Sequence, residues 1–138
     1  MDGKVTWREG LSFTGEANTG WRIPIGTTKD HGGRDDGASP MELMAMGLAA
    51  CSGMDVISIL KKKKQDVTDF EVVFHVDRAT DHPKVFTHVV LEYVVTGHQV
   101  EVAAVERAVE LSTTKYCSGY AMMEKAVPIE VKITVLEA

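Results

Sequence analysis

The sequence lacks the features that mark several large classes of protein. Its formal net charge of −5 provides no excess of basic residues, whereas a nucleic-acid-binding surface is expected to be basic. The N-terminal segment Met1–Trp7 has no apolar run of the kind found in secretory leaders. We therefore expect a cytoplasmic protein without a nucleic-acid partner.

Long uncharged apolar runs are also missing. The longest, Leu43–Met54, has 12 residues and lies between Glu42 and Asp55, whereas a membrane-spanning helix needs about 20 apolar residues. We interpret this run as part of a buried core helix, without membrane association. The length of 138 residues and the hydrophobic content of 44% predict one folded domain over residues 1–138.

Metal-binding patterns are absent as well. The five histidines show no ligand spacing, and neither CxxC nor HxxxH occurs, although structural zinc sites usually draw their ligands from such pairs. His75 and His88 could still face each other across two predicted strands. The sequence predicts no metal and no other cofactor.

Hydrophobic periodicity is what the sequence does contain, and it predicts six strands and two helices. The strands are Val5–Trp7, Leu11–Phe13, Trp21–Ile25, Phe70–Val76, Val85–Val95 and Val127–Val135, and the helices span 39–64 and 101–111. Glu9 and Gly10 predict a turn that joins the first two strands in a hairpin. In the second helix the residues expected to face inward are Ala104, Val105, Ala108 and Leu111.

The helix over 39–64 carries clear start and end signals. Ser39 suits the N-cap, Pro40 suits the first helical position, and Glu42 completes a capping box. Lys61–Lys64 favour the C-terminal end of the helix dipole. The first two-thirds of the helix are apolar on all sides, so this part must be enclosed. One chain of this size has too little sheet to enclose it, which predicts a homodimer.

Only two cysteines occur, Cys51 midway along this helix and Cys117 after the second helix. Each could be an inert thiol, because free cysteine often packs in a core as a small hydrophobic residue. In a cytoplasmic chain, however, paired cysteines are more often catalytic than structural. Together they favour a thiol redox pair.

A reactive Cys51 would need a lowered thiol pKa. Midway along a helix it gains little from the helix dipole, and Asp55, one turn further on, would raise the pKa if ionised. We therefore expect a cation from elsewhere in the fold. The candidates, which sequence spacing cannot separate, are Arg8, Arg22 and Arg34.

The sequence resembles the OsmC/Ohr family of thiol-dependent peroxidases over nearly its whole length. The resemblance rests on the hairpin, on the stretch SPMEL-x6-AC at Ser39–Cys51, on the two long strands, and on Cys117 before a final strand. It implies an α+β fold. In that fold antiparallel sheets wrap around long central helices in an intertwined homodimer.

The resemblance also implies an activity. A Cys51 thiolate would attack the O–O bond of an organic hydroperoxide and become a sulfenic acid. Cys117 would convert this acid to a disulfide, which a dithiol reductant would reopen.

The assisting residues of the family are displaced in this sequence, which indicates a divergent subgroup. Met41 stands where the family has a glutamate, and Glu42 follows one place later. Leu11 stands where the family has an arginine, and Arg8 is the nearest substitute. We assign Arg8 and Glu42 to the site on this basis, although Glu42 also fits a simple helix cap.

A second hypothesis belongs to a different class: a non-catalytic dimeric protein that binds a small apolar ligand. Its support is the number of methionines, because methionine-rich surfaces adapt to varied ligands. At helical spacing such residues are more often plain core. The methionines concerned are Met41, Met44, Met46, Met54, Met122 and Met123.

Overall fold

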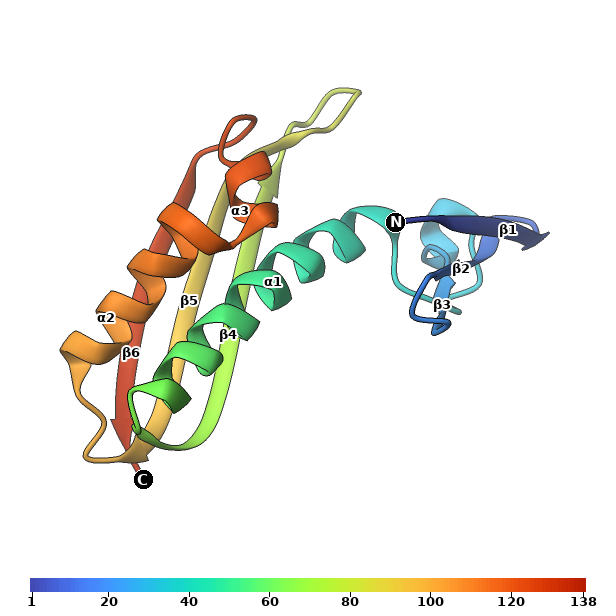
Figure 1. Ribbon diagram of the computed structural model, residues 1–138. Coiled ribbons are helices and arrows are strands. Elements are labelled where there is room, and N and C mark those ends of the chain that lie inside the picture. Colours follow the sequence, from blue (N-terminus) through green and yellow to red (C-terminus); the bar gives the residue numbers. More distant parts are fainter. The chain divides into compact units, whose positions relative to one another are not determined.

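The computed structural model describes all 138 residues as two compact units, Met1–Met44 and Ala45–Ala138. The sequence prediction of one domain over 1–138 stays a prediction. The α+β class is confirmed, because each unit holds a three-stranded sheet and the second unit adds helices (Figure 1).

The first unit is built on an antiparallel sheet in the order β1 (Gly3–Glu9), β2 (Ser12–Ala17), β3 (Arg22–Ile25). All three predicted strands are confirmed. Gly10 occupies the hairpin turn at a φ of 53°, a left-handed conformation that glycine adopts without steric cost. The polar stretch that follows contains a short 3₁₀ turn, η1 (Lys29–His31).

Helix α1 (Pro40–Lys62) begins with the capping box that the sequence predicts. The Ser39 amide donates to Glu42 Oε2 at 2.8 Å, and the Glu42 amide donates to Ser39 Oγ at 3.3 Å. Two amides that the first turn leaves without helical partners are satisfied in this way.

The second unit holds the sheet β4 (Asp66–Arg78), β5 (Phe86–His98), β6 (Ile129–Glu137), in that order. The pair β4–β5 is antiparallel, but β6 runs parallel to β5, so the expectation of purely antiparallel sheets is wrong here. Parallel neighbours need a crossover connection, and the chain makes it through α2 (Val102–Leu111), η2 (Ser112–Tyr116) and α3 (Ser118–Met123).

Helices α1 and α2 lie on one face of this sheet (Figure 1). The largest fully buried apolar side chains come from α1, β5 and α2: Val56, Leu60, Val89, Leu91, Tyr93, Val95 and Val105. On α2 the predicted inward residues are correct except at one position, where Val109 is buried in place of Leu111. Alternate residues of β5 therefore form the sheet side of the hydrophobic core.

Helix α1 is buried along one face only. Leu48, Val56 and Leu60 are buried, and Gly53 lets the helix approach β4, since a Cβ there would lie 3.2 Å from Val72 Cγ2. By length and composition α1 could also cross a membrane, a test that core helices of soluble proteins pass as well. Its other face exposes Met46 and Met54, the latter 71% exposed.

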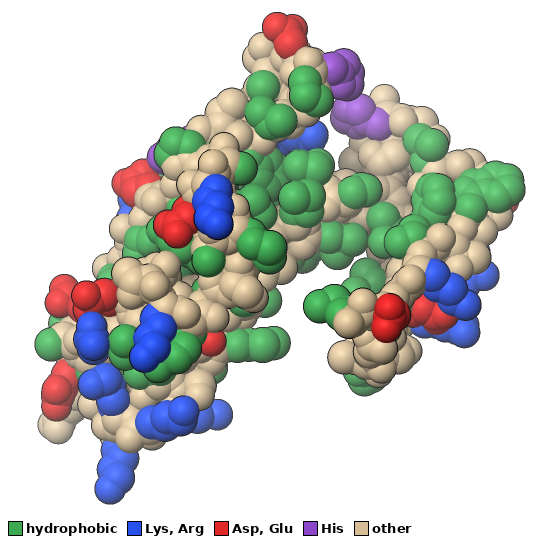
Figure 2. Space-filling view, turned by 45° about the horizontal axis from the view of Figure 1, so that its top comes forward, with side chains coloured by type: hydrophobic (Ala, Val, Ile, Leu, Met, Phe, Trp, Pro, Cys, Tyr) green, Lys and Arg blue, Asp and Glu red, His purple; other side chains and the backbone are tan.

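Basic side chains are densest at one end of the second unit. Figure 2 shows Lys and Arg side chains gathered at one end and hydrophobic side chains exposed elsewhere on the visible face. Lys61 and Lys62 lie in the last turn of α1, which ends two residues before the predicted position 64.

Candidate functional site

The fold brings the two cysteines together from separate elements. Cys51 lies on α1, and Cys117 is the N-cap residue of α3. A Cβ placed on Gly119 would lie 3.7 Å from Cys51 Sγ and 3.8 Å from Cys117 Sγ, so both sulfurs border the same glycine. Cys51 Sγ also lies 4.0 Å from Ser118 Oγ. Both thiols are free.

The two thiols differ in access to solvent. Cys117 is 3% exposed, and its sulfur accepts a hydrogen bond from the Tyr120 amide at 3.2 Å. Cys51 is partly exposed. A solute could therefore reach Cys51 more readily than Cys117.

The electrostatics of the site separate the thiols further. The pKa of Cys51 is lowered, first by the Gly119 amide that donates to its sulfur, and then by hydrogen bonds from Cys117 and Ser118. Burial and the charge of Asp55 oppose this shift. Burial, together with the hydrogen bond to Cys51, raises the pKa of Cys117 to about 11. Cys51 is thus the better nucleophile of the two.

This geometry confirms one of the two sequence expectations about the Cys51 pKa. Asp55 does act to raise the Cys51 pKa, as predicted. The expected cation stays a prediction, and donors at 117–119 already lower this pKa without one. The main donor is a backbone amide, and an amide can donate from any residue type except proline, so the residue types give no sign of it.

The other predicted site residues lie in the first unit. Arg8 Nε donates to Thr14 Oγ1 at 2.9 Å, and Glu42 forms the capping box with Ser39. The two alternative cations are paired with carboxylates: Arg22 with Glu16 at 3.2 Å, and Arg34 with Glu9. The catalytic roles of Arg8 and Glu42 stay predictions.

A buried hydroxyl cluster next to the cysteines was missed by the sequence analysis. Ser52 Oγ lies 2.6 Å from Tyr93 Oη and 2.8 Å from Ser112 Oγ, and Ser112 Oγ donates to Asp55 Oδ2 at 3.0 Å. Burial raises the pKa of Tyr93 to about 12. The sequence signal for this cluster is Ser52, immediately after Cys51, within the uncharged run Leu43–Met54.

The histidines do not form a metal site. No group of three or more His, Cys, Asp or Glu side chains could hold a metal ion. The strand register places His88 opposite Asp77, and His75 opposite Val90, so the two histidines do not face each other directly. Both instead contact Asp77, at 3.0 Å from His75 and 4.0 Å from His88.

The fold and the chain's sequence together define an OsmC-like protein. The family model for OsmC-like proteins matches residues 33–132, and the chain belongs to this family. Protein YhfA of Escherichia coli strain K12 is 46% identical over 129 residues, which cover 94% of this chain and 93% of that protein. The family resemblance inferred from the sequence is confirmed.

Solved structures agree with this assignment. A hypothetical protein from Aquifex aeolicus is 32% identical, with a TM-score of 0.87 over 99% of this chain and 96% of that one. An organic hydroperoxide resistance protein OsmC from Legionella pneumophila has a TM-score of 0.71 at 18% identity, with 97% of each chain covered. At that identity the likeness shows a shared fold.

Proposed function

We propose that the protein is a thiol-dependent peroxidase that reduces organic hydroperoxides. The observation that carries the proposal is the pair of free thiols at Gly119, one with a lowered and one with a raised pKa. A peroxidase of this kind needs one thiolate that attacks the peroxide and a second thiol close enough to attack the oxidised sulfur afterwards. The name of the Legionella relative of the same fold supports the substrate class.

In the first step the Cys51 thiolate attacks one oxygen of the hydroperoxide. A sulfur–oxygen bond forms, the O–O bond breaks, and the alkoxide leaves as an alcohol after it takes a proton. Sulfur gives up two electrons and becomes a sulfenic acid. The Gly119 amide and the Ser118 hydroxyl stabilise the negative charge of the thiolate before attack.

In the second step Cys117 attacks the oxidised sulfur of Cys51. The S–S bond forms, the S–O bond breaks, and the hydroxide leaves with the Cys117 proton as water. A dithiol reductant then exchanges with the disulfide and restores both thiols. We place this cycle in the cytoplasm, where such reductants keep thiols reduced.

Arg8 and Glu42 complete the proposed site as assisting residues. Arg8 would add positive charge near the Cys51 thiolate, and Glu42 would orient the Arg8 side chain. The bonds that each makes within the first unit, to Thr14 and to Ser39, are those of a surface side chain and a helix cap.

We also propose that the working unit is a homodimer. An apolar groove of about 460 Å³ runs between α1 and β4 of the second unit. It is lined by Met46, Ala50, Met54, Ile57, Phe70 and Phe74 among others. A second copy is the occupant we infer, because α1 is apolar around its circumference and one chain covers only one face.

The test is oxidation of the reduced protein with one equivalent of cumene hydroperoxide, followed by peptide mass mapping. We expect loss of both free thiols within seconds and an intrachain Cys51–Cys117 disulfide. Two thiols that stay free in excess hydroperoxide would contradict the proposal.

The exposed methionines favour one second candidate, a non-catalytic dimeric protein that binds a small apolar ligand. The same experiment separates the two. A binding protein would leave both thiols reduced, and an apolar fluorescent probe would still bind to the dimer with the thiols blocked.

A further inference from the structure

Ser112 connects the two segments that carry the cysteines. Its backbone carbonyl accepts the Cys117 amide at 2.8 Å. Its hydroxyl lies 2.8 Å from Ser52 Oγ on α1, the residue after Cys51, and donates to Asp55 Oδ2 at 3.0 Å. Ser112 therefore makes hydrogen bonds both to the backbone of Cys117 and to the residue next to Cys51.

The hydroxyl groups that link Ser112 to α1 are buried, and each has a hydrogen-bond partner. Ser52 and Ser112 are both 0% exposed, and Ser52 Oγ is also bonded to Tyr93 Oη of β5. No buried side-chain polar atom lacks a partner. Because an unpaired buried hydroxyl is costly, this cluster fixes the position of Ser112 against α1 and β5.

The backbone between Ser112 and Cys117 is a single π-helical turn, η2. The Cys117 amide reaches back five residues to the Ser112 carbonyl, which closes this turn. Such wide turns are rare and often lie at functional sites. Here the turn begins at the anchored serine and ends at the buried cysteine.

We propose that Ser112, held by Ser52, is a positioning residue that sets Cys117 for attack on oxidised Cys51. The inference rests on the proposed function for its chemistry: Cys117 sulfur bonds to Cys51 sulfur, and the hydroxyl of the sulfenic acid leaves with the Cys117 proton as water. The role concerns disulfide closure and not the reaction of Cys51 with peroxide.

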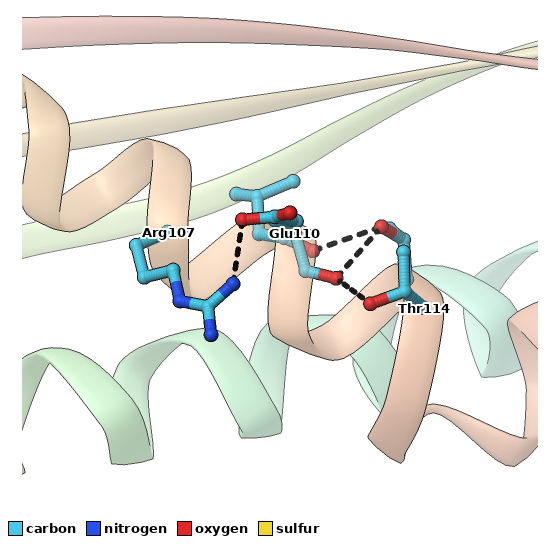
Figure 3. A network of polar contacts seen from close by, with 5 residues as sticks. Arg107, Glu110 and Thr114 are labelled. Atoms are coloured by element: carbon cyan, nitrogen blue, oxygen red, sulfur yellow. Dashed lines mark hydrogen bonds and ion pairs between the residues drawn. The ribbon is translucent and has the colours of Figure 1, made fainter.

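The same π-helical turn provides a matched control. Thr114 Oγ1 donates to the Glu110 carbonyl at 2.6 Å, within its own helical segment, and Glu110 is further paired with Arg107 at 2.7 Å (Figure 3). Thr114→Ala therefore removes a hydroxyl from this turn without breaking a link to α1. Ser112→Ala removes the link itself.

The experiment follows the two steps separately after rapid mixing with cumene hydroperoxide. We expect Ser112→Ala to oxidise Cys51 at the parent rate but to close the disulfide about tenfold more slowly. A sulfenic acid that dimedone traps should accumulate. Thr114→Ala should match the parent in both steps. Ser52→Ala breaks the same link from the α1 side. If Ser112→Ala fails to fold, Ser52→Ala is compared with Thr114→Ala instead.

A second readout does not depend on peroxide. The reduction potential of the Cys51–Cys117 pair, measured in dithiothreitol buffers, should shift in Ser112→Ala and Ser52→Ala but not in Thr114→Ala. Closure rates and potentials equal in all variants would overturn the inference and leave the peroxidase proposal intact. A shifted potential without any hydroperoxide reaction would overturn the peroxidase proposal alone.

Discussion

The two units of the molecule differ in how they hold their polar groups. In the first unit the predicted assisting residues Arg8 and Glu42 make exposed bonds to near neighbours in sequence. In the second unit Ser52 makes hydrogen bonds to Tyr93 and Ser112, 41 and 60 residues away in sequence, in a buried cluster beside both thiols. We therefore expect the proposed thiol chemistry to depend most on the second unit.

The largest effect is expected from Cys51→Ser. It removes the only thiol with a lowered pKa, so hydroperoxide consumption should fall by a factor on the order of a thousand or more. Consumption of cumene hydroperoxide with dithiothreitol as reductant measures this. Cys117→Ser is the matched control.

Cys117→Ser should retain one round of oxidation and then drift to sulfinic and sulfonic acid at Cys51. Intact-mass measurement after oxidation distinguishes these products. If Cys51→Ser and Cys117→Ser lose the first oxidation equally, the separation of roles between the two thiols is wrong.

The next effect concerns assembly. Met54→Glu places a charge in the apolar groove of the second unit, and burying an unpaired charge in an interface is costly. We expect the variant to shift from dimer to monomer at micromolar concentration in sedimentation velocity. Met122→Glu, the same change at a methionine outside that groove and 69% exposed, should leave the assembly unchanged. A folded, stable monomer of the parent would refute the dimer.

A smaller effect is expected from the first unit. If Arg8 assists, Arg8→Ala in a Cys117→Ser background should raise the Cys51 pKa by roughly one unit. Arg34→Ala tests the second candidate cation. Arg107→Ala, which removes an exposed arginine paired with Glu110, is the control. The pH dependence of Cys51 alkylation reports the result, and an unchanged pKa in both test variants would confine activation to the donors at 117–119.

The smallest effect concerns stability. Tyr93→Phe leaves a buried hydroxyl cluster with one bond fewer and should lower the free energy of unfolding by about 1–2 kcal/mol. Tyr116→Phe, at a tyrosine that is 53% exposed, should change it little. Urea unfolding followed by circular dichroism compares the two, and equal midpoints would show that the cluster does not stabilise the fold.

The six strands and the two longer helices could be predicted because their hydrophobic patterns are strong, whereas the short segments η2 and α3 were not predicted. Alternation located β5 and β6, but it could not give their relative direction, since parallel and antiparallel strands expose the same alternate residues. The capping box at Ser39 was predictable because its partners are three residues apart.

The site was less accessible to sequence reasoning. The presence of only two cysteines favoured a redox pair of Cys51 and Cys117, and the family resemblance supplied their separate roles. The donor from Gly119 is a main-chain amide, and the bond between Ser52 and Ser112 joins residues 60 apart. Neither interaction leaves a local sequence pattern, so both become visible only in the three-dimensional structure.

The separate roles proposed for Cys51 and Cys117 depend on the different protonation of the two thiols in their surroundings. The most direct test of this difference is alkylation of the reduced protein with iodoacetamide across a pH series, with each cysteine followed by peptide mass spectrometry. We predict that Cys51 reacts with a midpoint below the ordinary thiol pKa of about 8.5, and that Cys117 becomes reactive only near its raised pKa of about 11. Two cysteines that react together near pH 8.5, or Cys117 ahead of Cys51, would contradict the account.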